Sequence, residues 1–301
     1  MSRLAAQLRR PGAYALGLLC AGIAAMIYSL AGFIIREFDE ASGSQIVFYR
    51  SLALVPTLCV IYLLRHRGQW RARLAEAAPQ VLRAGPFQAM SSTCFVYSLA
   101  FTTVASTLFI QGAVPIIAAA LAWMFLRERP GGATLAAMAA VLAGVALMVG
   151  DGLFGGNLVG NLFALGAAIA FSCYIVLLRR GRNVDMLPSV AVGGCVAAVA
   201  NGLLAPSLAV SLHDILLCFA WGSLLHAGGT IFYTYASRHI PASDLSLVGM
   251  LEIVLAPFWT WIAVSEVPSL LSILGGGVIL IAVALWTMAR ARGHDGAGGE
   301  R

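Results

Sequence analysis

Residues 123–130 read WMFLRERP, and residues 261–268, 138 positions later, read WIAVSEVP. Trp, Glu and Pro occupy matching positions, which gives the shared pattern Trp-x4-Glu-x-Pro. Arginines flank the first Glu, whereas Ser265 and Val267 flank the second. Duplicated apolar stretches with different flanking charge are typical of inverted repeats in membrane carriers. The pair therefore predicts two halves of opposite orientation.

The composition indicates a membrane protein. Hydrophobic residues make up 60% of the 301 residues and charged residues only 11%, whereas a soluble domain has about a quarter charged residues. A lipid-exposed sheet would leave backbone groups unpaired, so the spans are predicted to be helices. We expect an all-α polytopic membrane protein with ten transmembrane helices at about 12–35, 44–64, 80–100, 103–126, 131–149, 158–178, 186–207, 213–236, 240–264 and 268–289.

The arginines predict the topology of these helices. All 19 basic residues are Arg, and with the N-terminus inside, 17 of them fall in inner loops or tails. Arg36 falls in an outer loop and Arg50 within a helix. Because positive residues favour the cytoplasmic side, we predict a multi-pass protein of the bacterial inner membrane with both termini cytoplasmic.

An odd number of helices in each half inverts the second half. We expect a cytoplasmic N-terminus at 1–11, a first repeat at 12–150, a second repeat at 151–289 and a disordered cytoplasmic tail at 290–301. Glu128 then lies at the inner face and Glu266 at the outer face, so the duplicated motif cannot form one pocket. Glu128 and Glu266 are interpreted as structural residues of the loops, since an acid at a helix C-terminus opposes the helix dipole.

Several functions are excluded by what the sequence lacks. Without Lys there is no P-loop to hold phosphates and no amine for a Schiff base. No aromatic residues alternate with the arginines, so a nucleic-acid partner is not expected. The six cysteines form no CxxC pair and lie in apolar segments, where they are interpreted as small buried residues, not metal ligands.

Short motifs resemble those of one transporter family. Val114–Pro115 precedes an apolar run that ends at Glu128, and Phe48–Tyr49–Arg50 lies in the second predicted helix. Ala105–Ser106 and Ala242–Ser243 begin the fourth and ninth helices. In order, spacing and duplication these motifs resemble the drug/metabolite transporter superfamily, in its EamA-type branch, over residues 12–289.

The resemblance implies a secondary active transporter of a small metabolite, an amino acid or related compound, with export favoured. It implies alternating access around a central cavity between the halves, and no cofactor. The chain departs from the family pattern at Glu252–Ile253, where the family often has Glu–Pro. The next proline is Pro257, so we expect a displaced kink in this helix.

Three ionisable residues inside predicted helices are candidates for substrate binding or coupling. Glu252 falls at the centre of its helix, where an acid costs about 2.5–3.5 kcal/mol and must face protein or water. It is either a contact for a substrate ammonium or coupling proton, or a hydrogen-bonded packing residue. Arg50 either holds a substrate carboxylate, or extends to the outer surface or pairs with an acid. His226 either relays protons or forms an interhelical hydrogen bond.

The other candidates are polar-tipped residues within helices, which either line a cavity or pack. They are Tyr28, Tyr97, Gln111, Tyr174, Tyr233 and Trp259. Pro115 and Pro257 are interpreted as structural residues that bend or interrupt their helices. The small residues Gly132, Ala136, Ala140 and Gly144 form a ridge that suits close helix packing or a dimer face, so the chain is expected to be a monomer or homodimer.

Three other functions compete with transport. An intramembrane enzyme is disfavoured because the chain has no HExxH, GxSxG or intramembrane Asp pair. A channel usually needs rings of ligands from symmetric subunits. A lipid-translocating protein would require an Arg-lined cavity open to lipid. The prediction is a non-enzymatic carrier whose partners are the bilayer and a small molecule, with proton coupling as an option.

Overall fold

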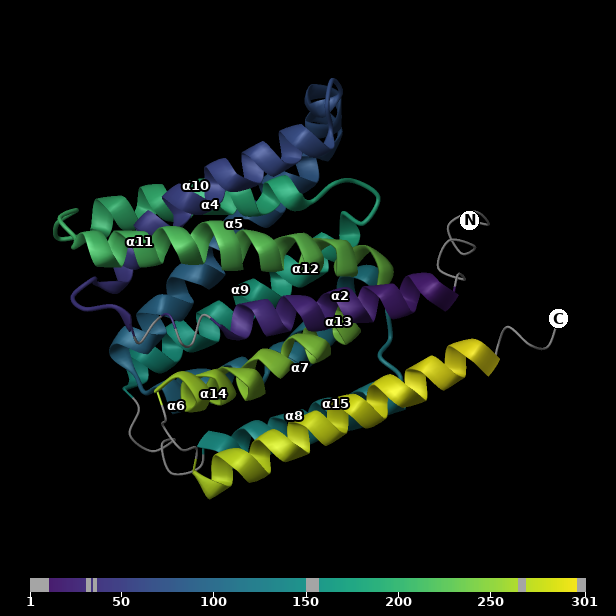
Figure 1. Cartoon of the computed structure of the whole chain (residues 1–301). Helices are drawn as coiled ribbons and strands as arrows, with labels where there is room; N and C mark the ends of the chain where they lie inside the picture. Colours follow the sequence, from purple (N-terminus) through teal and green to yellow (C-terminus); the bar gives the residue numbers. More distant parts are fainter. Residues whose placement is uncertain (1–10, 31–33, 35–36, 150–156, 265–268, 297–301) are drawn as a thin grey trace.

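The computed structural model describes residues 11–30, 34, 37–149, 157–264 and 269–296, and within these ranges the regular structure is entirely helical. The helices lie side by side in one bundle (Figure 1). Those of the first half are α2 (Pro11–Ser29), α4 (Gly43–Arg65), α5 (Trp70–Phe101), α6 (Val104–Gln111), α7 (Val114–Leu126) and α8 (Gly132–Val149). Those of the second half are α9 (Leu158–Arg180), α10 (Leu187–Leu204), α11 (Leu212–Ala220), the π-helix η3 (Trp221–His226), α12 (Ala227–His239), α13 (Ala242–Gly249), α14 (Leu251–Val264) and α15 (Leu270–Gly296).

Every predicted span corresponds to one helix or to consecutive helices, which confirms the polytopic all-α class. Within the described ranges, seven helices are long and apolar enough to cross a membrane, and a shorter apolar helix covers Gly132–Met148. The spans 103–126 and 240–264 are each broken into two helices, and 213–236 contains the π-helix. Helix α5 begins at Trp70, ten residues before its predicted start, since the polar turns at its beginning continue the same helix.

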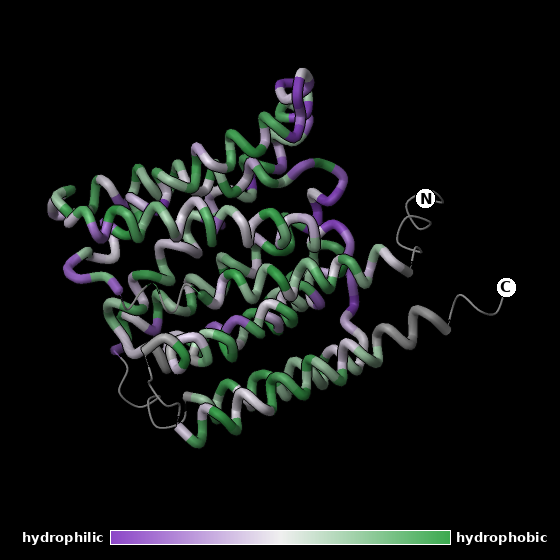
Figure 2. The backbone as a smooth tube through the Cα atoms, viewed as in Figure 1, coloured by the Kyte–Doolittle hydropathy of each residue, from purple (hydrophilic) through white to green (hydrophobic). Residues whose placement is uncertain are grey.

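The distribution of side chains is that of a protein in lipid. Large apolar residues cover the outside of the helices, as at Leu203, Leu270 and Ile281, whereas Ser, Thr and Ala fill much of the interior. Hydrophilic residues gather toward the two ends of the bundle, with apolar helices between (Figure 2). In water such a surface would expose far more apolar area than a soluble monomer shows.

The two halves run in opposite directions, as the charge pattern predicted. Helix α2 starts at the end of the bundle where the N-terminus is marked, and α9 starts at the opposite end (Figure 1). Helix α15 ends near the start of α2, so the two chain ends lie on the same side of the bundle. Which membrane face this end occupies stays a prediction.

The helix breaks fall at equivalent positions of the repeat. The first half breaks at Gly112–Ala113 between α6 and α7, and the second at Met250 between α13 and α14. Met250 follows Gly112 by 138 residues, the offset of the duplicated motif. Pro115 explains the first break, because a proline has no N–H to bond the carbonyl one turn back.

The second break lies before Pro257, where the sequence places a displaced kink, and that kink stays a prediction. Helix α14 continues through Pro257 to Val264, and the break comes earlier. The backbone there tightens, with the Met250 N–H donating to the Leu247 carbonyl (3.2 Å) and the Ile253 N–H to the Met250 carbonyl (3.1 Å). The break therefore follows the repeat, not the proline.

The first copy of Trp-x4-Glu-x-Pro forms the end of α7. Arg127 adopts the left-handed conformation at φ 57°. The Glu128 N–H donates to the Ala122 carbonyl at 3.3 Å, so the motif satisfies carbonyls that the helix end would leave free. Of the second copy, Glu266 and Pro268 lie outside the described residues.

Helices α8 and α15 pack against one another through small residues. A Cβ added to Gly144 would meet Ile279 Cγ1 at 2.6 Å, and one added to Gly275 would meet the Gly144 carbonyl oxygen at 2.4 Å. Thus Gly144 serves packing within the chain, which accounts for that end of the small-residue ridge without a dimer.

Candidate substrate cavity

A small cavity lies between α2, α9, α12 and the α13–α14 break. Its enclosed volume is about 10 Å³, close to the space that one water molecule or one ammonium group needs. Its lining combines one carboxylate with three aromatic rings and small or flexible residues. The lining residues are Ala25, Tyr28, Phe171, Tyr233, Ser246, Gly249, Met250 and Glu252.

Glu252 lies in the first turn of α14, directly after the helix break. The positive end of a helix dipole favours a carboxylate at this position. Among the described residues no hydrogen bond or ion pair engages the Glu252 side chain. The break thus places an unpartnered acid in the middle of the bundle.

The aromatic rings of the cavity form a connected group. The ring centroids of Tyr28 and Tyr233 lie 6.2 Å apart, and those of Phe171 and Tyr233 lie 6.0 Å apart. The Tyr28 hydroxyl shares a hydrogen bond of 3.1 Å with Thr230 Oγ1. The Tyr233 hydroxyl is buried and has no hydrogen-bond partner in the described part of the chain. The cavity therefore offers a second polar group that is not satisfied.

Arg50 lies beside this cavity but does not line it. Its guanidinium donates to Ser92 Oγ and stacks over the Trp221 ring at 4.8 Å from the centroid. The acid partner that the sequence allowed for it is not found among the described residues. Trp221 and His226 both come from η3, and π-helical turns are frequent at functional sites. The His226 ring meets Tyr28 edge to face, with centroids 6.0 Å apart.

The other sequence candidates lie at different distances from the cavity. Tyr174 is buried beside it, with its ring 6.3 Å from Phe171 and its hydroxyl 3.4 Å from Ser189 Oγ. Trp259 Nε1 donates to Ser29 Oγ at 2.8 Å.

Tyr97 and Gln111 are not among the lining residues. The Tyr97 ring stacks on Phe101 at 6.3 Å and lies tilted against Phe163 at 5.6 Å, and Gln111 ends α6. Pro115 is buried in the first turn of α7.

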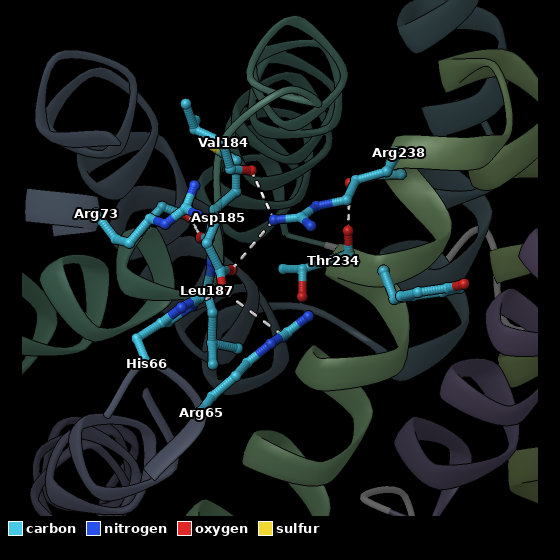
Figure 3. A network of polar contacts seen from close by, with 12 residues as sticks. Arg65, His66, Arg73, Val184, Asp185, Leu187, Thr234 and Arg238 are labelled. Carbon is cyan, nitrogen blue, oxygen red and sulfur yellow. Dashed lines mark hydrogen bonds and ion pairs between the residues drawn. The ribbon is translucent and has the colours of Figure 1, made fainter. Parts of the chain in front are cut away.

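The arginine-rich end of the bundle is the end where α4, α7, α9 and α12 finish. Asp185 connects several side chains at this end. Its carboxylate, 7% exposed, is 2.8 Å from His66 Nε2, 3.6 Å from Arg65 and 3.5 Å from Arg238. Figure 3 shows Arg65 and His66, at the end of α4, and Arg238, from α12, converging on Asp185. Burial raises the pKa of Asp185, but the His66 hydrogen bond, the Leu187 N–H and the two arginines outweigh it, and the net pKa is lowered.

A second ion pair closes the same end. Arg179 Nε donates to Glu128 Oε1 at 2.9 Å, and the Arg179 side chain is only 4% exposed. The same guanidinium donates to the carbonyl of Arg238 at 3.0 Å. The contacts of Arg65 and His66 with Asp185, and of Glu128 with Arg179, join the first half to the second and must break when the halves separate at this end. Arg238 contacts both Asp185 and Arg179 from within the second half.

At the opposite end of the bundle, different polar contacts join the two halves. Both oxygens of the fully buried Asp214 carboxylate accept backbone N–H groups, those of Asp39, Glu40 and Ala41, at 3.1–3.3 Å. Gln45 donates to the carbonyls of Ser207 and Ala209. The two ends of the bundle are thus closed by different chemistry, ionic at one and largely backbone hydrogen bonds at the other.

Sequence reasoning missed several of these residues. Phe171 and Met250 gave no signal, because an aromatic or Met in an apolar helix is ordinarily core. Asp185 had a usable signal, since it is an acid in a loop that follows three arginines. Trp221 and Ser92 could not be connected to Arg50 without the helix packing.

An inverted helical bundle broken at symmetric positions around a central cavity has the form of a carrier. The EamA-like transporter family model matches this chain twice, at residues 15–150 and 158–288. The chain therefore belongs to the EamA-like transporter family, within the drug/metabolite transporter superfamily that the motifs resemble. This confirms the predicted family and a transporter, not an enzyme.

Two curated relatives are similar over most of the chain. The pseudopaline exporter CntI of Pseudomonas aeruginosa PAO1 is 26% identical over 289 residues, which are 92% of this chain and 96% of the relative. The pseudopaline exporter CntI of strain UCBPP-PA14 is 25% identical over the same length. A solved crystal structure with a TM-score of 0.75 and 18% identity covers 92% of this chain and 98% of its own, and supports the fold.

Proposed function

We propose that this protein exports a small metabolite, an amino acid or related compound, by alternating access around the cavity at Glu252. The observation that carries the proposal is the position of the cavity, at the symmetric helix break where the two halves meet. In carriers built from inverted repeats, discontinuous helices of this kind present helix ends and unpaired polar groups to a substrate. The exporter function of the two relatives supports the direction of transport.

Closure at both ends suits alternating access. The Asp185 and Glu128 networks join the halves at the arginine-rich end, and the Asp214 contacts join them at the other. Each set consists of polar contacts that water can replace when the halves part. A channel would instead need a continuous path, whereas this cavity is small and lies within the bundle.

We further propose that transport is secondary active, in the bacterial inner membrane, with both termini cytoplasmic. Glu252 is the candidate group for proton coupling, because it is acidic, central and unpartnered in the described region. The chain could act as a monomer, since Gly144 is used for packing within the chain.

The test begins by comparing metabolites released by cells with and without the protein. Any compound released only with the protein is then followed in proteoliposomes by counterflow. We expect saturable flux that is lost in Glu252→Gln and kept in Glu76→Gln, which changes an exposed acid of α5. Linear flux without saturation would favour a channel, transfer of labelled lipid a lipid-translocating protein, and a covalently altered product an enzyme.

A further inference from the structure

The cavity combines an unpartnered carboxylate with faces of aromatic rings. Glu252 contributes the carboxylate, and Tyr28, Phe171 and Tyr233 contribute the rings. A carboxylate together with ring faces is the chemistry that binds an organic cation, because the ring face carries negative charge and attracts cations at distances up to about 6 Å. The lining includes no basic side chain.

We propose that this cavity binds the ammonium group of an organic amine, with Glu252 as its counter-ion and the aromatic rings as its walls. The proposal rests on the proposed function and deepens it, because it gives the chemical class of the transported molecule. An amino group of a zwitterion and the amino group of a simple amine would be recognised in the same way.

The polar groups of the cavity favour a ligand over internal packing. Glu252 is partly buried, and a packing role would require a hydrogen-bond partner, since a charge withdrawn from water without one is costly. The described residues provide none. Tyr233, only 5% exposed, also leaves its hydroxyl without a partner in the described region. A bound ammonium group donates hydrogen bonds, and both the Glu252 carboxylate and the Tyr233 hydroxyl oxygen can accept them.

One of the two helix ends at the break favours a cation as well. Gly249 and Met250, at the C-terminal end of α13, line the cavity. The carbonyl end of a helix carries partial negative charge and favours cations. The N-terminal end of α14 carries the opposite partial charge and interacts favourably with the Glu252 carboxylate. At the break, a bound cation would therefore face the Glu252 carboxylate on one side and the backbone carbonyl end of α13 on the other.

An anionic ligand group is disfavoured at the same position. Glu252 would repel it. Arg50, the arginine beside the cavity, contacts Ser92 and Trp221 and is not a lining residue. Any carboxylate of the ligand must therefore point away from Glu252.

The test measures binding to the purified full-length protein in detergent. The probes are 2-phenylethylamine, phenylalanine and the neutral isostere 2-phenylethanol, each at millimolar concentration. Thermal stabilisation and quenching of tryptophan fluorescence report binding. We expect saturable binding of the two ammonium compounds and at least tenfold weaker binding of 2-phenylethanol.

Matched variants assign the binding to this cavity. Glu252→Gln should weaken amine binding at least tenfold, whereas Glu76→Gln should leave it unchanged. Tyr233→Leu should weaken it about fivefold, the loss expected for one cation–π contact of about 1 kcal/mol. Tyr97→Leu, which changes a tyrosine that does not line the cavity, should have no effect. The fluorescence titration compares only folded protein, so a variant that lowers stability still gives a binding constant.

Three results would overturn the proposal. They are equal binding of 2-phenylethanol, full amine affinity in Glu252→Gln, and no binding of either ammonium compound. If Glu252→Gln binds amines normally but loses proton-dependent flux, Glu252 is a coupling site instead. Amine binding without flux in proteoliposomes would remove the transport function and keep the site. Saturable flux of a neutral solute that is insensitive to Glu252→Gln would keep the transport function and exclude the amine site.

Discussion

Replacing Asp185 by Asn should loosen the arginine-rich end of the bundle. Asp185 is 7% exposed and accepts a hydrogen bond from the Leu187 N–H at 3.1 Å, besides its contact with His66. Asn keeps the shape and can still accept from Leu187, but it removes the charge that faces His66, Arg65 and Arg238. The variant therefore isolates the ionic part of the closure.

The size of the effect follows from the exposure of the partners. A hydrogen bond to a charged group contributes about 1.5–3 kcal/mol. Arg65 is 41% exposed, so its share is reduced by solvent screening. We take about 2 kcal/mol as the total loss, or about 30-fold in an equilibrium. The Arg238 contact lies within the second half, but the His66 and Arg65 contacts join the two halves and exist only when this end is closed. The population open at this end should therefore rise by about that factor.

Labelling of a buried cysteine measures this population. Ser237 is 1% exposed and lies in α12 near the network, so Ser237→Cys in a chain whose six native cysteines are replaced by Ala is a suitable reporter. We expect maleimide to label this cysteine about 30-fold faster in Asp185→Asn than in its parent.

Two controls separate opening from unfolding. Glu76→Gln removes an exposed ion pair to Arg73 (3.8 Å) and should not change the rate. A cysteine at Ser98, which is fully buried in α5, should stay slow in Asp185→Asn. An unchanged rate at position 237 would refute the role given to Asp185, and equal acceleration at position 98 would show general destabilisation.

Three further predictions concern stability and topology. Glu128→Gln should lower the free energy of unfolding by about 3 kcal/mol, because it leaves the buried Arg179 without its carboxylate; equal thermal midpoints for wild type and variant would contradict this. Gly275→Ala should lower it by about 1–3 kcal/mol through overpacking, since its new Cβ would meet the α8 backbone. Gly277→Ala, on the same helix with open space, is the matched control, and similar losses in both would argue against the α8–α15 contact. Green fluorescent protein fused after Arg301 should fluoresce, and alkaline phosphatase fused there should be inactive; the opposite pattern would invert the topology.

The helices and their opposed halves were predictable because a bilayer imposes long apolar spans and sorts arginines by side. The breaks within helices were harder to predict from the sequence. Pro115 marks the first, but at the equivalent position of the second half Ile253 replaces proline, and the nearby Pro257 lies seven residues after the break at Met250. In the structure the second break lies at the position that the 138-residue offset of the repeat gives from the first.

The candidate site was predictable in its ionisable members only. Glu252, Arg50 and His226 stand out because charge within a membrane span is costly. Of the tyrosines, Tyr28 and Tyr233 line the cavity and Tyr97 does not, and sequence offered no way to tell them apart, since each lies in an apolar helix. Phe171 and Met250 became visible only through packing across α9, α12 and α13.

Flux of an identified metabolite through proteoliposomes, compared between wild type and Glu252→Gln, tests the central claim most directly. We expect saturable counterflow by the wild-type protein and at least a tenfold loss in Glu252→Gln, with Glu76→Gln as active as wild type. Equal flux in wild type and Glu252→Gln would contradict a transport route through this cavity.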